Sequence, residues 1–354
     1  LKKWVTYLGI HTDNYIVNYS SYGDWASPIT QTVKGSLGAG AVSANTPGNL
    51  ISTGFYYYNS QLMAKIAHVL GKTSDVEMYK DLSEQIKEAF NNTFFDTKTN
   101  QYATGSQACN VFALFLGLVT PENEKSVLEN IIIDIIEKNN KHLTTGNICT
   151  KYIMEVLSEA GRMDIAYLLA TQSTYPSWGY MISNGATTIW ERWEYVTGEE
   201  CGMASHNHPM YGSISTWFYK MLGGINVDCD GPGFEKIIIR PQIIGDLDFV
   251  ESSVKTIRGL VESKWRKTQD AFYLEVNIPF NAEAWVYVPK MIRNENNFTI
   301  VGNSLMIYEG KTLLWNCGIF MAQCEEISEC IELENSICFK IGSGYYSFKI
   351  TNIN

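Results

Sequence analysis

The sequence predicts an α+β protein of two domains, a helical domain followed by an antiparallel β-sandwich. Three observations support this prediction. The chain has 354 residues, which is too long for one small core. Residues 1–226 show helical periodicity with start and stop signals, whereas residues 227–354 show short apolar runs between Gly, Asn, Pro and Asp. The composition changes at 227–233, so we place the domain boundary near residue 227.

Start and stop signals predict a series of helices in residues 1–226. Gly71 and Gly161 follow periodic apolar segments, and glycine favours the left-handed conformation that ends a helix. Ser74-x-x-Glu77 indicates a capping box, and Thr120-Pro121 indicates an N-cap with proline in the first turn. Short connections between helices indicate antiparallel hairpins, either stacked or closed into a ring. The predicted helices cover 1–8 (the end of a helix), 50–70, 74–90, 109–118, 120–138, 151–159, 163–172 and 210–222.

Residues 227–354 have the pattern of a β-sandwich. Short runs rich in β-branched and aromatic residues alternate with turn-forming residues, which is typical of strands joined by tight connections. The predicted strands cover 236–241, 271–278, 284–289, 298–301 and 344–350.

Composition and charge restrict the class of ligand. The net charge of -10 and the pI near 5.1 argue against nucleic acid or an anionic membrane surface as partner. The apolar segment at 131–136 is interrupted by Asp134, and we find no run long enough to span a membrane. Aromatic residues make up 13% of the chain, with 9 Trp and 21 Tyr, which suits recognition of a neutral carbohydrate.

The 8 cysteines show no Cys-x-x-Cys pair and no zinc-type spacing with histidine. Cys317, Cys324, Cys330 and Cys338 lie close together in the sequence, so one or two disulfides there stay open. We favour free thiols in a reducing compartment and therefore predict a cytoplasmic location. We predict no cofactor and no metal ion.

The segment Gly185-Ala-Thr-Thr-Ile-Trp-Glu-Arg-Trp-Glu194 is the candidate site. Glu191 lies between Trp190 and Trp193, and a sugar-cleaving site needs this combination of apolar ring surfaces and a carboxylate whose pKa they tune. The alternative is that both indoles belong to the core and that Glu191 forms an ion pair with Arg192 or another base.

The sequence contains five motifs in this order: 22–25 (Tyr-Gly-Asp-Trp), 175–181 (Tyr-Pro-Ser-Trp-Gly-Tyr-Met), 185–193, Ser205-x-x-His208 with 211–213, and 231–241. Together they resemble bacterial α-L-rhamnosidases of glycoside hydrolase family 78. They span nearly the whole chain, and the Trp-Glu-Arg-Trp block with its Gly-Ala-Thr-Thr lead is the specific one. The resemblance implies a six-hairpin α/α toroid, with its N-terminal part missing here, followed by the β-sandwich.

The resemblance also implies roles for individual residues. Glu191 matches the general base that activates water in an inverting hydrolysis of α-L-rhamnosides, whose substrates are rhamnose-containing glycosides. The remaining matched positions are expected to bind the sugar. They are Asp24, Trp25, Trp178, Trp190, Trp193 and His208.

An inverting hydrolysis also needs a second carboxyl group, the general acid, and here the sequence departs from the family pattern. The family's general acid lies in a segment ending in Glu-Arg-Leu-Gly-Trp, upstream of Gly-Asp-Trp, and the sequence contains no such segment. The chain opens on Leu1, and we expect it to continue something longer and to be inactive by itself. Asp24 and Glu194 are poor substitutes for the acid, because Glu194 is close to Glu191 in sequence and Asp24 matches a hydroxyl ligand.

Other interpretations of these residues remain open. His206-x-His208 with Glu191 is a possible metal site, although a third spaced ligand is lacking. Asp24 follows Gly23 and is also explained as a helix cap or an Asx turn. Trp178 is also explained by core packing. At the level of the whole chain, the alternatives to the hydrolase are a non-catalytic carbohydrate-binding or structural fragment and a toroid hydrolase acting on a different sugar. We also expect the isolated chain to self-associate into a homo-oligomer.

Overall fold

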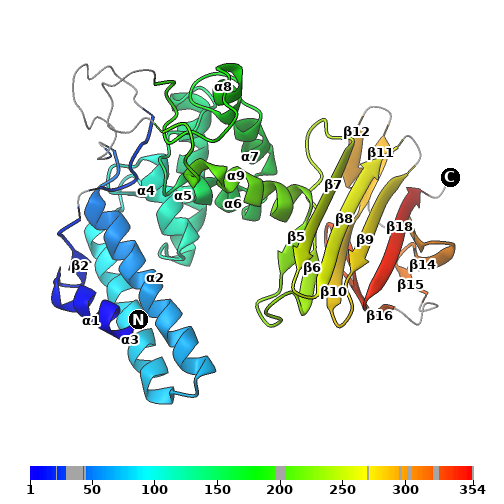
Figure 1. The fold of residues 1–354 in the computed structure, drawn as a ribbon, viewed down its shortest axis with the longest axis horizontal. Helices are drawn as coiled ribbons and strands as arrows, with labels where there is room; N and C mark the ends of the chain where they lie inside the picture. The colour runs from blue at the N-terminus through cyan, green and yellow to red at the C-terminus, as the bar shows by residue number, and fades with distance from the viewer. Residues whose placement is uncertain are drawn as a thin grey trace. The chain divides into compact units, whose positions relative to one another are not determined.

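A computed structural model describes residues 1–20, 22–28, 43, 45–196, 205–268, 271–294, 297–300, 305–321 and 327–352. The chain divides into two compact units, Leu1–Ile214 and Ser215–Asn354. Helices dominate the first unit, coloured blue to green in Figure 1, and strands dominate the second, coloured yellow to red. This arrangement confirms the predicted α+β class, while closure of the hairpins into a toroid stays a prediction.

The first unit begins with a short helix and a long helical hairpin. Helix α1 spans Lys2–Ile10, and the two-residue strands β1 (Thr12–Asp13) and β2 (Ile16–Val17) follow it. Helices α2 (Gly48–Val69) and α3 (Thr73–Phe94) lie side by side in Figure 1.

Gly71 joins α2 to α3 with φ +66°, in the left-handed conformation that the sequence predicted for it. The predicted capping box was wrong. Helix α3 begins one residue earlier, at Thr73, because the N–H of Val76 already bonds to the carbonyl of Lys72. Ser74 therefore lies inside the first turn of the helix and does not cap it.

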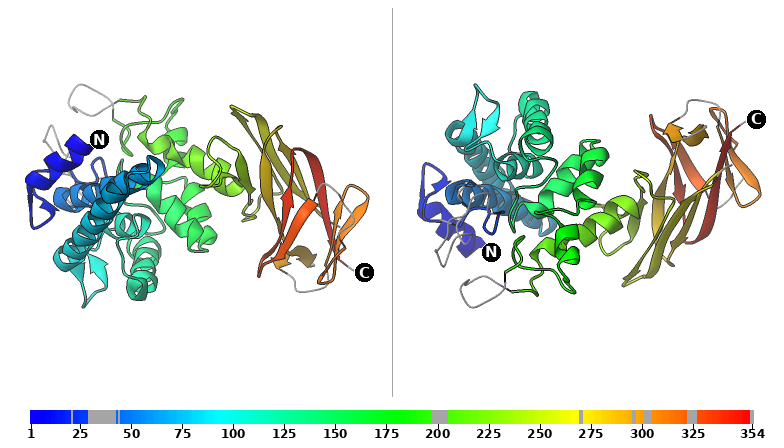
Figure 2. Two further views of the ribbon diagram at one scale, coloured as in Figure 1. Left: turned by 90° about the horizontal axis from the view of Figure 1, so that it is seen from below. Right: turned by 90° about the horizontal axis from the view of Figure 1, so that it is seen from above.

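The middle of the first unit contains a small hairpin and two helices. Strands β3 (Phe95–Asp96) and β4 (Gln101–Tyr102) form the hairpin, drawn in cyan in Figure 2. Helix α4 (Gln107–Phe115) starts earlier than predicted, because the Ser106 hydroxyl caps it by accepting the Cys109 N–H at 3.2 Å. Helix α5 (Pro121–Ile133) has the predicted proline in its first turn and continues as the π-helical turn η1 (Asp134–Lys138).

The last elements of the helical part differ in part from the prediction. The predicted helix over 210–222 consists of three consecutive pieces, and the short helix α8 was not predicted. The elements are α6 (Thr150–Glu159), α7 (Met163–Ala170), α8 (Trp178–Ser183), η2 (Met210–Ser213), α9 (Ile214–Trp217) and η3 (Phe218–Leu222). Within the described residues, no helix has both the length and the apolar character needed to cross a bilayer.

The second unit contains two main sheets. The five-stranded sheet has the order β16-β17-β10-β6-β5 and the seven-stranded sheet the order β15-β14-β13-β18-β9-β8-β7. Their pairs are antiparallel except β6 with β10, which is parallel. The strands are β5 (Ile225–Val227), β6 (Lys236–Ile239), β7 (Phe249–Thr256), β8 (Gly259–Lys267), β9 (Phe272–Ile278), β10 (Glu283–Pro289), β11 (Met291–Asn294), β12 (Asn297–Ile300), β13 (Leu305–Glu309), β14 (Thr312–Asn316), β15 (Ile319–Phe320), β16 (Ile327–Glu332), β17 (Ser336–Ile341) and β18 (Gly344–Asn352).

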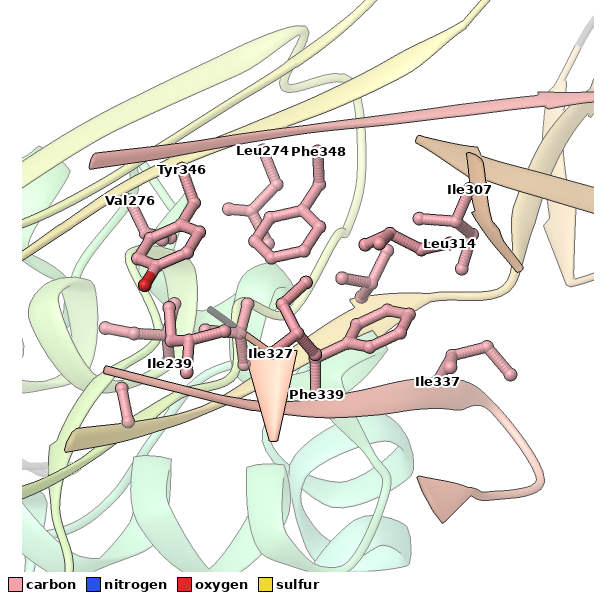
Figure 3. Close-up of a cluster of buried hydrophobic side chains, with 14 of the residues drawn as sticks. Ile239, Leu274, Val276, Ile307, Leu314, Ile327, Ile337, Phe339, Tyr346 and Phe348 are labelled. Atoms are coloured by element: carbon pink, nitrogen blue, oxygen red, sulfur yellow. The ribbon is translucent and has the colours of Figure 1, made fainter. Parts of the chain in front are cut away.

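One continuous apolar core holds the two sheets together, as expected of a sandwich. Burial alternates residue by residue along β9 and β10, so each strand turns one set of side chains inward. Phe339 of one sheet stacks on Phe348 of the other, with ring centroids 5.7 Å apart, and neither ring is exposed. Figure 3 shows these rings among the buried side chains between the layers.

The described cysteines are free thiols. They are Cys109, Cys149, Cys229, Cys317, Cys330 and Cys338. Cys201 and Cys324 lie outside the described residues.

Candidate active site

The segment that carries Glu191 has no regular secondary structure and pairs with the segment that carries His208. The N–H of Glu191 donates to the carbonyl of Ser205 at 2.9 Å, and the N–H of His208 donates to the carbonyl of Ile189 at 2.8 Å. The N–H of Ser205 also donates to Glu191 Oε2 at 3.2 Å. This pairing fixes Glu191 and His208, two predicted site residues, in neighbouring positions.

Trp25 reaches the same place from a distant part of the sequence. Its ring meets the ring of His208 edge to face, with centroids 5.8 Å apart and an interplanar angle of 87°. Both side chains are half-buried. The structure therefore pairs the segments of Glu191 and His208 and sets the Trp25 indole against the imidazole, and all three residues are partly exposed.

Asp24, the neighbour of Trp25, does not have the exposed position expected of a residue that binds a sugar hydroxyl. Its side chain is 0% exposed. Oδ2 accepts the N–H of Gly146 at 2.6 Å, and Oδ1 accepts those of Ile148 and Cys149 at 2.9 and 3.0 Å. Because these donors precede helix α6, the carboxylate serves as a cap for that helix from another part of the chain. The geometry favours the capping interpretation of Asp24.

Burial and hydrogen bonding act on the Asp24 carboxyl group in opposite directions. Loss of solvent raises its pKa to about 6, because an ionised carboxylate is costly in an apolar environment. The three main-chain N–H donors lower it, but by less. At neutral pH the group is therefore ionised and accepts all three hydrogen bonds.

Trp178, Trp193 and Tyr211 pack against one another. Trp193 is 0% exposed and stacks on the Tyr211 ring at 4.1 Å, and its Nε1 donates to the Thr145 carbonyl at 3.0 Å. Trp178 is 7% exposed, and its Nε1 donates to the Tyr211 carbonyl at 2.9 Å. Both indole N–H groups are used inside the protein. This packing favours a supporting role for the two indoles.

Trp190 is also covered by other rings. It is 2% exposed and stacks on His206, with centroids 4.8 Å apart. Tyr195 lies against it at 5.2 Å. A sugar therefore meets His206 or Tyr195 before it meets the face of Trp190 on that side.

Arg192 forms an ion pair next to the candidate base. The Nε of Arg192 lies 3.1 Å from Glu194 Oε2, and Arg192 is buried. The hydroxyl of Tyr175 donates to the other oxygen of Glu194 at 2.5 Å. Among the described residues, Arg192 thus pairs with Glu194. The alternative interpretation, in which Arg192 pairs with Glu191, finds no support here.

Asn147 belongs to the site although the sequence did not single it out. Its main-chain N–H donates to the Trp25 carbonyl at 2.8 Å, and its side-chain Nδ2 donates to the Glu191 carbonyl at 3.3 Å. An asparagine after a glycine has the local appearance of an ordinary turn residue. No pattern within the segment could have indicated its distant contacts.

The described residues include one group of side chains arranged so that they could hold a metal ion. It consists of Asp228, Cys229 and Asp230 and does not include the histidines near Glu191. Exposed acidic groups of this kind are common in loops, so we assign it no role.

A partly exposed carboxylate and aromatic rings on paired segments of a helical domain are features typical of carbohydrate sites. Residues 1–222 match the family described as bacterial alpha-L-rhamnosidase 6 hairpin glycosidase domain. Residues 224–299 match the bacterial alpha-L-rhamnosidase C-terminal domain. The chain belongs to this rhamnosidase family, which confirms the resemblance found in the sequence.

Individual relatives agree with the family match. The chain is 36% identical over 289 residues to an alpha-L-rhamnosidase of Alteromonas sp. (strain LOR), covering 80% of this chain and 31% of that protein. An alpha-L-rhamnosidase of Streptomyces avermitilis is 31% identical over 290 residues, covering 81% of this chain and 26% of that protein. The chain thus spans about a quarter to a third of the length of these relatives.

Two solved structures share the fold. The alpha-L-rhamnosidase from Dictyoglumus thermophilum superimposes with a TM-score of 0.85 at 36% identity, covering 99% of this chain and 36% of that one. The Streptomyces avermitilis alpha-L-rhamnosidase complexed with L-rhamnose gives a TM-score of 0.80 at 26% identity, covering 98% and 30%.

Proposed function

We propose that the complete gene product carrying this chain hydrolyses α-L-rhamnosides and releases terminal L-rhamnose. The observation that carries the proposal is that the segment of Glu191 pairs with the segment of His208, whose ring contacts Trp25, in a chain of this family. Relatives that bear the name alpha-L-rhamnosidase support the choice of sugar.

In this proposal Glu191 is the general base. Its carboxylate takes a proton from a water molecule, and the water oxygen attacks the anomeric carbon from the face opposite the departing oxygen. A second carboxyl group donates a proton to the departing oxygen as the glycosidic bond breaks. The two events produce L-rhamnose of inverted anomeric configuration and an alcohol.

Among the described residues, the two candidate carboxyl groups Asp24 and Glu194 are unsuited to act as the acid. Asp24 is fully buried and accepts three main-chain N–H groups, and Glu194 is engaged with Arg192 and Tyr175. We therefore keep the prediction that the acid comes from a segment of the Glu-Arg-Leu-Gly-Trp type, which the printed sequence does not contain.

The exposure of each aromatic ring indicates which rings contact the sugar. We propose that Trp25 and His208 contact L-rhamnose, since both are half-buried and touch each other at the site. His206 covers one face of Trp190, and Trp178 and Trp193 support the segment of Glu191 by packing against each other. Asp24 acts on the sugar only through the residues that it holds.

The stereochemistry of the product tests this mechanism. The complete gene product is incubated with an aryl α-L-rhamnoside, and the anomer formed first is identified by proton NMR before mutarotation. The proposal predicts β-L-rhamnose. Initial formation of the α anomer contradicts inversion, and absence of aryl release favours the alternative, a protein that binds carbohydrate without cleaving it.

Two further proposals concern the cell and assembly. Free thiols at the described cysteines fit a reducing compartment, so we keep the cytoplasm as the proposed location.

Trp4, Tyr7 and Ile10 expose apolar surface on α1, with 51%, 44% and 73% of each residue accessible. This surface fits self-association of the isolated chain. Sedimentation velocity tests it, and a monomer at all concentrations contradicts it.

A further inference from the structure

We infer that Asn147 is a positioning residue for Glu191: its side-chain amide fixes the main chain at the proposed base and so sets where the carboxylate lies. The inference rests on the proposed function, because it concerns the base of that reaction. It assigns Asn147 no contact with the substrate.

Both main-chain polar groups of Glu191 are held. On one side, its N–H donates to Ser205, and Ser205 in turn donates to the Glu191 carboxylate. On the other side, its carbonyl accepts the Nδ2–H of Asn147 at 3.3 Å. Residues 188–191 have no helix or sheet to fix them, so these contacts determine the direction of the Glu191 side chain.

Burial of the Asn147 side chain lowers the stability of the folded protein. Asn147 is 0% exposed, and its Oδ1 accepts no hydrogen bond from the described residues. A buried polar group without a partner costs about 1–3 kcal/mol. An apolar side chain of similar size would avoid this cost, so stability alone does not explain an amide here. The orientation of the amide is also determined, because the opposite one would set Oδ1 against the Glu191 carbonyl oxygen.

Asn147 is itself held rigidly, as a positioning residue must be. Its main-chain N–H donates to the Trp25 carbonyl at 2.8 Å. Asp24 binds the N–H groups on both sides of it, those of Gly146 and Ile148. A Cβ on Gly146 would lie 2.2 Å from the Trp25 carbonyl oxygen, so only glycine permits this close approach. The turn thus links the indole of Trp25 to the main chain of the proposed base.

This arrangement predicts a specific kinetic effect. A shift of about 1 Å in a catalytic group lowers turnover by up to about 10²-fold. Loss of the Asn147 amide frees the Glu191 carbonyl but leaves the rings of Trp25 and His208 in place. Turnover should therefore fall while the affinity for L-rhamnose is retained.

The test uses Asn147→Leu and Asn147→Asp in the complete gene product. Leucine removes the amide at similar volume, and aspartate keeps the shape but, when ionised, turns an oxygen toward the Glu191 carbonyl. Asn130→Leu and Asn130→Asp are matched controls, because the Asn130 amide also holds main-chain carbonyls, those of Thr99 and Asn100, away from the site. Glu191→Gln is measured in the same series.

We expect kcat for an aryl α-L-rhamnoside to fall about 10- to 100-fold in both Asn147 variants. The Kd for L-rhamnose by calorimetry should stay within about threefold, as should kcat in both Asn130 variants. The activity of the Asn147→Asp variant should also recover on acidification, since a protonated carboxyl group donates to the carbonyl again.

Unchanged kcat in the Asn147 variants overturns the inference while leaving the base assignment intact. Equal losses of kcat, L-rhamnose affinity and folding, or failure of both variants to fold, also overturn it, because they indicate a purely structural residue. Wild-type kcat in Glu191→Gln shows instead that the proposed base is wrong, and the inference then fails with it.

Discussion

Asp24 Oδ2 accepts the N–H of Gly146 at 2.6 Å, although the two residues lie far apart in the sequence. This hydrogen bond connects the loop that carries Trp25 to the turn that precedes helix α6. The same turn provides Asn147, which contacts the main chain of Glu191. A buried carboxylate thus organises the site without facing it.

The buried carboxylate predicts a pH dependence of stability. Folding raises the pKa of Asp24 from 3.8 to about 6, so the folded protein binds its proton more tightly than the unfolded chain. The contribution of Asp24 to the free energy of unfolding should then fall by about 3 kcal/mol as pH rises from about 3 to about 7. Urea unfolding of wild type and Asp24→Asn across this range measures the difference.

Asp164 provides the control of opposite sign. Its hydrogen bond with Arg162 lowers its pKa, so its contribution to stability should rise with pH in the acidic range. The difference in free energy of unfolding between wild type and Asp164→Asn should therefore rise with pH, whereas the difference for Asp24→Asn should fall. A difference for Asp24→Asn that is constant or rises with pH contradicts the account of Asp24.

Gly146→Ala should disturb the site through sterics alone. The added Cβ would lie 2.2 Å from the Trp25 carbonyl oxygen and 2.5 Å from that of Asp24, so the main chain must move. We expect a loss of about 1–3 kcal/mol in stability together with weaker L-rhamnose binding. Gly342→Ala is the control, because nothing lies within 4 Å of its Cβ position. Unaltered binding and melting in Gly146→Ala would show that the contact is not tight.

Trp25→Ala should weaken sugar binding. Removal of a half-buried indole at the site takes away ring surface that a pyranose face can cover. We expect the Kd for L-rhamnose to rise about tenfold, which corresponds to about 1.4 kcal/mol. Calorimetry on the complete gene product measures it, with Trp285→Ala, a half-buried indole of the sandwich, as the matched control. Equal affinity in the two variants places the sugar elsewhere.

Much of the fold could be predicted from local signals. Pro121 and Gly71 mark a helix start and a helix end because their own backbone preferences determine the conformation there. Strand β9 was predictable from its aromatic and branched residues. Strand β8 was missed, since Glu262, Lys264 and Arg266 on its outer face give it the composition of a loop.

The site was predictable only where a residue carries its own chemical signal. The sequence motifs located Glu191 and His208, and the structure shows their segments paired. The buried role of Asp24 and the contacts of Asn147 depend on hydrogen bonds between distant segments. Such contacts follow from tertiary packing, which local sequence patterns do not encode.

The sandwich core allows a stability prediction independent of the site. Phe339 and Phe348 are unexposed and stack across the two sheets. Phe339→Ala should lower the free energy of unfolding of this unit by about 3–5 kcal/mol, because a large cavity replaces the ring. Phe280→Ala, at a residue that is 84% exposed, should change it by less than about 0.5 kcal/mol. Urea unfolding of both variants checks this, and equal effects contradict the assigned core.

The most direct test of the central claim is the turnover of an aryl α-L-rhamnoside by the complete gene product and its Glu191→Gln variant. Glutamine keeps the shape of the side chain but cannot accept the proton of water. We expect kcat to fall about 10²- to 10⁴-fold with L-rhamnose binding retained, and an exposed control, Glu129→Gln, to match wild type. Turnover near the wild-type rate in Glu191→Gln would show that Glu191 is not the base.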